Sequence, residues 1–138
     1  MEEEIKAEDD DFARLHFMLS RRVLVVDDNI DNAEIMAAVL RESGHEVYVA
    51  HDGRSAVAEA RRLRPEFLFL DLGLPGLDGF QVAETLRREP GLEAMRIIAV
   101  TAYGQESDRR RAREAGFDQH LVKPVDMAFV ESMLGGAR

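Results

Sequence analysis

The stretch VLVVDDN, residues 23–29, places four apolar side chains directly before two adjacent carboxylates, Asp27 and Asp28. Such an apolar run is typical of a buried strand. Neighbouring like charges repel each other, and removing either from water costs free energy. A divalent cation would offset this repulsion, so the stretch predicts a cation site at the end of a strand.

Four further apolar runs follow, and helix-length amphipathic segments separate them. The runs that we expect to be strands are 23–26, 47–50, 67–70, 97–100 and 120–122. Most of them lack polar alternation, which is typical of strands covered on both faces. The remaining segments predict helices at 29–43, 54–63, 80–88, 107–115 and 126–134. This alternation predicts an α/β fold in which helices cover both faces of a parallel sheet.

The first predicted helix has a regular apolar face. Within 29–43, apolar residues recur at helical spacing at Ile35, Met36, Val39 and Leu40. We expect this face to lie on the sheet. Gly44 then follows as a stop signal.

The acidic charge of the 138-residue chain is concentrated at its N-terminus. The formal net charge is −9, of which residues 1–11 carry −6 and the remainder −3, so neither part has the basic patch of a nucleic-acid binder. We expect residues 1–20 to form an acidic extension with a short amphipathic helix. Its apolar stripe would be Phe12, Leu15 and Leu19. Residues 21–138 are expected to form one folded domain.

Composition excludes several classes of site and location. The chain has no cysteine, which rules out disulfides, thiolate metal sites and a cysteine nucleophile. No apolar run approaches the roughly 20 residues of a membrane-spanning helix, and the N-terminus lacks a secretory signal pattern. We therefore expect a cytoplasmic protein.

Polar residues follow four of the predicted strands where each strand ends; in chain order they are Asp27, Asp28, Asp71, Thr101 and Lys123. Because ligands bind beyond the carboxyl ends of the strands in open α/β sheets, these side chains should meet at one edge. Three carboxylates beside a hydroxyl and an ammonium group suit magnesium and a phosphoryl group. The combination therefore predicts a phosphoryl and magnesium site.

A single Asp after a strand has a simpler explanation. It is more often a turn former or a helix N-cap than a metal ligand. Asp28 or Asn29 is accordingly a candidate cap for the first helix, and Asp78 for the third. The prediction of a site depends on all five residues together.

Four motifs, in this order and at these intervals, resemble the receiver domain of response regulators in two-component signalling. They are VLVVDDN (23–29), LDLGLPGLDGFQV (70–82), VTAYG (100–104) and HLVKPVD (120–126). The resemblance covers about residues 21–134, so 21–138 is interpreted as the receiver domain. It looks most like receivers attached to hybrid sensor histidine kinases. The resemblance implies a chemotaxis-Y-like (βα)5 fold, a doubly wound five-stranded parallel sheet in the flavodoxin-like order 2-1-3-4-5.

The resemblance also implies a role for each acidic residue. Asp71 would accept a phosphoryl group from a phosphohistidine donor, which is a sensor histidine kinase or a histidine phosphotransfer domain. Asp28 and Asp71 would bind magnesium directly, together with the backbone carbonyl of Gly73. Asp27 would act mostly through a metal-bound water.

Three residues of the fourth and fifth strands complete the implied switch. Lys123 would pair with the phosphoryl oxygens, and Thr101 would swing its hydroxyl onto them. His120 stands where the family commonly has Tyr or Phe. An imidazole can fill that slot as a ring, or its charge can bias the switch near neutral pH, since an unperturbed His titrates near pH ~6.5. The Lys123–Pro124 bond is a candidate cis peptide.

In the family, the positions of Tyr103 and Gly73 tune how fast the phosphoryl group is lost. We expect the bulky Tyr103 ring to shield that group from water. The face made by the fourth helix, fifth strand and fifth helix is the family's usual output surface. The implied protein is a signalling switch that catalyses only its own phosphotransfer and dephosphorylation, and its output would pass to a partner protein, a neighbouring domain or a second copy.

Three other functions remain as alternatives. A receiver fold can serve as a docking or dimerisation module without being phosphorylated. A phosphatase of the haloacid dehalogenase type would share the Asp, Thr, Lys and magnesium, but Gly73 and Pro75 stand where its motif needs Asp and Thr. A flavodoxin would need a phosphate-binding loop where the acidic DDNIDN follows the first strand.

Overall fold

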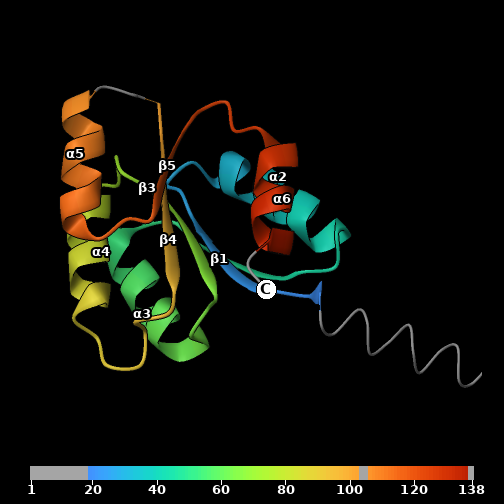
Figure 1. The fold of residues 1–138 in the computed structure, drawn as a ribbon, viewed down its shortest axis with the longest axis horizontal. Coiled ribbons are helices and arrows are strands. Elements are labelled where there is room, and N and C mark those ends of the chain that lie inside the picture. Colours follow the sequence, from blue (N-terminus) through green and yellow to red (C-terminus); the bar gives the residue numbers. More distant parts are fainter. Residues whose placement is uncertain (1–18, 103–105, 137–138) are drawn as a thin grey trace, which may run out of the picture.

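The fold is a five-stranded parallel sheet between two layers of helices (Figure 1). A computed structural model describes residues 19–102 and 106–136 of the chain. The strands are β1 (Arg22–Val26), β2 (Glu46–Ala50), β3 (Phe67–Asp71), β4 (Arg96–Thr101) and β5 (Gln119–Val122). They pair in the order β2-β1-β3-β4-β5, and every pairing is parallel. The predicted fold class and strand order are confirmed, and each strand lies within one residue of its expected bounds.

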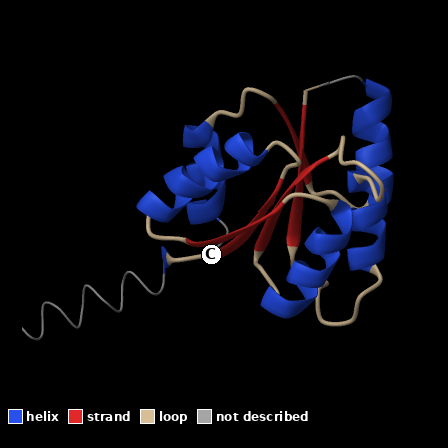
Figure 2. Cartoon of the chain, turned by 180° about the vertical axis from the view of Figure 1, so that it is seen from behind, coloured by secondary structure: helices blue, strands red, loops and turns tan. Residues whose placement is uncertain are grey.

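Helices cover both faces of this sheet, as Figures 1 and 2 show from opposite sides. They are α2 (Ile30–Glu42), α3 (Gly53–Leu63), α4 (Gly79–Arg87), α5 (Glu106–Ala115) and α6 (Met127–Gly136). One core forms between the sheet and α3, α4 and α5, and a second between the sheet and α2 and α6. Central strands therefore bury both of their faces, which explains their unbroken apolar runs.

Helix α2 packs through smaller residues than its apolar pattern predicted. Ala33, Ala37 and Leu40 are fully buried against the sheet, whereas Ile35 is 65% exposed. The expectation that Ile35 faces the core is wrong. Ala33 and Ala37 stand one helical turn apart and occupy the contact with the sheet, so Ile35, two residues from each, lies on the opposite side of the helix.

Two turns bring the start of a helix to the carboxyl edge of the sheet. Asn29 caps α2 by accepting the Asn32 backbone N–H at 3.0 Å, which decides between the two candidate caps. Asp78 caps α4 in a reciprocal capping box with Gln81, as expected. Both caps fix the loops that follow β1 and β3.

Arg21, a buried cation, forms hydrogen bonds at the opposite edge of the sheet, where the strands begin. Its Nε donates to the carbonyl of Leu134 at 3.0 Å, and its Nη1 lies 2.7 Å from Oε2 of Glu66. Its backbone N–H donates to Nδ1 of His45 at 3.0 Å. These contacts tie the segment before β1 to the last turn of α6.

The predicted N-terminal helix falls almost wholly on residues 1–18, which lie outside the described part of the chain. The division of the chain at residue 20 therefore stays a prediction. None of the helices in the described ranges is long and apolar enough to cross a membrane.

Candidate functional site

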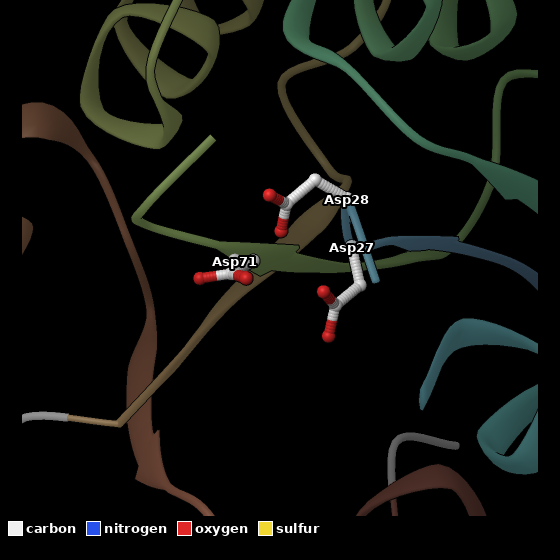
Figure 3. A group of neighbouring side chains, drawn as sticks. All are labelled: Asp27, Asp28 and Asp71. Carbon is white, nitrogen blue, oxygen red and sulfur yellow. The ribbon is translucent and has the colours of Figure 1, made fainter. Parts of the chain in front are cut away.

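Three carboxylates gather at the carboxyl edge of the sheet (Figure 3). Asp27 follows β1 and is buried, Asp71 ends β3 and is 9% exposed, and Asp28 is exposed. Each offers an oxygen, and these atoms all lie within 4.8 Å of one another. The predicted convergence of the acids is confirmed, because β1 and β3 are neighbours that end at the same edge.

Asp27 is held by hydrogen bonds on its backbone and on both carboxylate oxygens. Its N–H donates to the carbonyl of Ala50 at the end of β2, at 3.2 Å. Its Oδ1 accepts the backbone N–H of Asn29 at 2.9 Å, and its Oδ2 accepts Nζ of Lys123 at 2.9 Å. The side chain is therefore fixed in one orientation.

Asp71 lies in an environment that opposes its charge. Burial raises the pKa of its carboxyl above the ordinary value, and the nearby charge of Asp27 adds to this effect. The N–H of Gly73, which donates to Oδ1 at 3.0 Å, and the ammonium of Lys123, 3.4 Å from Oδ2, act in the opposite direction. An added cation would favour the ionised carboxylate, which is the nucleophilic form.

Lys123 links the fifth strand to the two buried acids. Burial lowers the pKa of its ammonium, but the hydrogen bond to Asp27 and the charges of Asp71 and Asp27 outweigh burial, so the pKa is raised. Its backbone N–H donates to the carbonyl of Thr101 at 2.8 Å. The Lys123–Pro124 peptide is cis, as the resemblance implied.

A cavity of about 350 Å³ lies beside Asp71; its lining also includes Gly73, Phe80, Thr101, Asp108 and Lys123. Thr101 is buried at the end of β4. Asp71, Thr101 and Lys123, which are predicted to supply the acceptor, the hydroxyl and the ammonium group, therefore border the same cavity.

The donor set fits magnesium. This ion prefers oxygen ligands in near-octahedral geometry at about 2.1 Å, so opposite ligands stand about 4 Å apart. The acid oxygens within 4.8 Å of one another require only small movements to reach that spacing. Asp27, Asp28 and Asp71 would hold the ion. A role for the Gly73 carbonyl stays a prediction, because the contact that the structure gives is through its N–H.

The residues predicted for the switch and for phosphoryl loss are placed only in part. His120 lies on β5 opposite Ala99 and is half-buried. With Arg109, Arg113 and other residues of α5 and β5, it lines a hollow of about 320 Å³. Tyr103 lies outside the described residues, so its shielding role stays a prediction.

Sequence reasoning missed two residues at this edge. Asp108 lines the cavity beside Asp71 from the first turn of α5. It follows no strand, so the strand-end rule does not point to it. His51 follows β2 and contacts the backbone of Asp27. The rule that located the other residues, a polar side chain after a strand, also applies to His51.

The strand order and the acid, hydroxyl and lysine edge together define a receiver of two-component signalling. The model of the response regulator receiver domain matches residues 23–134. The chain therefore belongs to the response-regulator receiver family.

Two solved structures and one curated relative illustrate the similarity. The chain is 36% identical to PilH of Pseudomonas aeruginosa over 105 residues. The aligned region covers 76% of this chain and 87% of PilH. Vibrio cholerae CheY4 superposes with a TM-score of 0.79 at 27% identity, covering 83% of this chain and 96% of that one. The receiver domain of the Pseudomonas aeruginosa sensor histidine kinase PA1611, solved with magnesium in its active-site cleft, gives 0.77 at 33% identity, covering 83% and 94%.

Proposed function

We propose that this receiver is a phosphorylation-dependent switch that accepts a phosphoryl group on Asp71 in the presence of magnesium. The observation that carries the proposal is the position of Lys123. Its ammonium lies 2.9 Å from Asp27 and 3.4 Å from Asp71, next to acid oxygens that fit a divalent ion. The magnesium-bound receiver of PA1611 supports the same ion here.

The transfer requires positioning and charge neutralisation more than covalent chemistry from the protein. A carboxylate oxygen of Asp71 attacks the phosphorus of a phosphoimidazole; the P–N bond breaks, a P–O bond forms, and the leaving imidazole takes up a proton. A magnesium ion held by the acids would supply positive charge beside the phosphoryl oxygens. Lys123 pairs with these oxygens as a point charge, and Thr101 donates its hydroxyl to one of them.

The phosphorylated state is relayed along β4 and β5. Thr101 ends β4, and the Lys123 N–H binds its carbonyl, so movement of Thr101 is transmitted to β5. His120 lies on β5 three residues before Lys123, next to α5. The phosphoryl group stabilises the active form of the domain, in which the face formed by α5, β5 and α6 is altered. The population of that form rises by an amount set by this stabilisation.

The donor is a sensor histidine kinase or a histidine phosphotransfer domain, and the output goes to a partner protein, a neighbouring domain or a second copy. In this proposal the chain is a signalling component, not an enzyme acting on a separate substrate. Its chemistry is limited to its own phosphorylation and dephosphorylation.

Intact mass after incubation with acetyl phosphate tests the proposal. Wild type with magnesium should gain one phosphoryl group, whereas Asp71→Asn, or wild type with a chelator, should gain none. Beryllofluoride, which mimics a phosphoryl group, covers the case of a short-lived adduct. A wild type that binds magnesium but forms neither adduct would favour the docking-module alternative.

A further inference from the structure

His51 lies at the end of β2 as Asp27 lies at the end of β1. Val26 and Ala50 are partners in the parallel register, so the residues that follow them are neighbours. Nδ1 of the half-buried His51 lies 3.0 Å from the backbone oxygen of Asp27. Because a carbonyl can only accept, Nδ1 carries the hydrogen and donates it.

The accepting carbonyl belongs to the peptide that joins Asp27 to Asp28. A peptide group is planar, so holding its oxygen restricts the rotations on either side of it. These rotations set the directions of both carboxylates. The preceding peptide is also held, because the Asp27 N–H donates to Ala50 at 3.2 Å. The end of β2 therefore fastens Asp27 from both sides.

We infer that His51 is a positioning residue for the magnesium site, which it serves by fixing the peptide between Asp27 and Asp28. The inference rests on the proposed function, because it takes Asp28 as a direct ligand and Asp27 as an acid that holds the ion mostly through a bound water. Groups that orient metal ligands typically change metal affinity by 10- to 100-fold when they are removed. His51 orients both acids of the site through one backbone hydrogen bond.

A purely structural role is the competing explanation. His51 precedes Asp52, which caps α3 by accepting the Ser55 N–H at 2.8 Å, so its hydrogen bond also fastens this loop. His45 offers a matched control at the other end of β2, where its Nδ1 accepts the Arg21 N–H at 3.0 Å. Removing either histidine should cost stability, but only His51 should affect the metal.

Three substitutions separate the hydrogen bond from the ring. His51→Asn places an amide N–H close to the position of Nδ1 and keeps the donor. His51→Gln carries the amide one bond further, near the position of Nε2, and His51→Ala removes the donor. Titration of amide resonances with magnesium chloride alone gives the affinity without phosphorylation, and thermal unfolding without the metal gives the stability.

His51→Ala and His51→Gln should bind magnesium about tenfold more weakly than wild type. His51→Asn should keep the wild-type affinity, and His45→Ala should keep it despite a lower melting temperature. If His51→Ala fails to fold, the Asn and Gln variants decide the question.

Wild-type affinity in His51→Ala or His51→Gln would overturn the inference and leave the proposed function standing. Equal weakening in His51→Asn and His51→Gln would overturn the hydrogen-bond account. A wild type that binds no magnesium would instead contradict the proposed function itself.

Discussion

The ammonium nitrogen of Lys123 lies 2.9 Å from Oδ2 of Asp27. Asp27 is thus paired with a cation of the protein at the place where the donor set fits a magnesium ion. The lysine has two opposing effects in our proposal. It competes with the metal for the acids, and it assists the incoming phosphoryl group.

Substitution of Lys123→Met should separate these two effects. Magnesium should bind more tightly, because a positive charge has left the acidic cluster. Phosphorylation by acetyl phosphate should slow by roughly 10- to 100-fold, since a hydrogen bond to a charged group contributes about 1.5–3 kcal/mol. Amide titration and intact mass measure the two quantities. Arg110→Met, at an exposed position on α5, loses the same charge and should change neither.

Gly79→Ala should displace the backbone of Asp71. A Cβ at this position would lie 2.5 Å from the carbonyl oxygen of Asp71 and 2.8 Å from Cα of Leu72. The loop must shift, so we expect a loss of about 1–3 kcal/mol in the free energy of unfolding and slower phosphorylation. In Gly135→Ala, on α6, the new Cβ has open space and should stabilise the helix. Urea unfolding measures the stability and intact mass measures the phosphorylation. Equal effects of the two substitutions would contradict this account.

Thr101→Ala should uncouple phosphorylation from the response of β5. The hydroxyl is the proposed link between the phosphoryl group and the output face. Beryllofluoride should therefore still bind the variant, but the amide resonances of β5 should shift much less than in wild type. Thr101→Ser keeps the hydroxyl and should restore the shifts. Wild-type shifts in the Ala variant would exclude this relay.

His45 should make the free energy of unfolding depend on pH. Burial lowers the pKa of His45, and the charge of Arg21 adds to this, while Glu131 and Glu66 partly oppose it. The unfolded chain therefore binds protons more readily. The resulting stabilisation of the folded state is complete above the pKa of His45 in the unfolded chain, near ~6.5. It is lost as the pH falls toward the lower pKa of the folded chain.

Urea unfolding of wild type and His45→Asn between about pH 7.5 and 5 measures this dependence. The Asn variant keeps a hydrogen-bond acceptor but cannot titrate. The difference in unfolding free energy between the two proteins should shrink as the pH falls. A constant difference would show that His45 titrates equally in both states.

The sequence predicted the site well because of a geometric rule. The carboxyl ends of parallel strands meet at one edge, so the sequence alone places the residues after those strands together. Asp27, Asp71 and Lys123 do meet there. The spacing that fits magnesium and the raised pKa of Asp71 depend on side-chain orientation and burial, which strand positions alone do not determine.

The errors have physical causes as well. Hydrophobicity ranks Ile35 above Ala33 and Ala37, so the pattern places it inside, but the two alanines occupy the contact with the sheet. His51 has the position of a site residue, because it follows β2, but its contact with the backbone oxygen of Asp27 depends on ring orientation, which the sequence does not give.

The contact between Arg21 and the carbonyl of Leu134 joins the two ends of the described fold at the edge opposite the acids. Arg21 and Leu134 therefore lie side by side near the start of the strands, whereas Asp71 lies where β3 ends. A graft of this domain into an unrelated chain would place both junctions next to each other, at the end of the sheet away from Asp71. Such a graft would leave Asp71, the proposed acceptor, open to a phosphoryl donor.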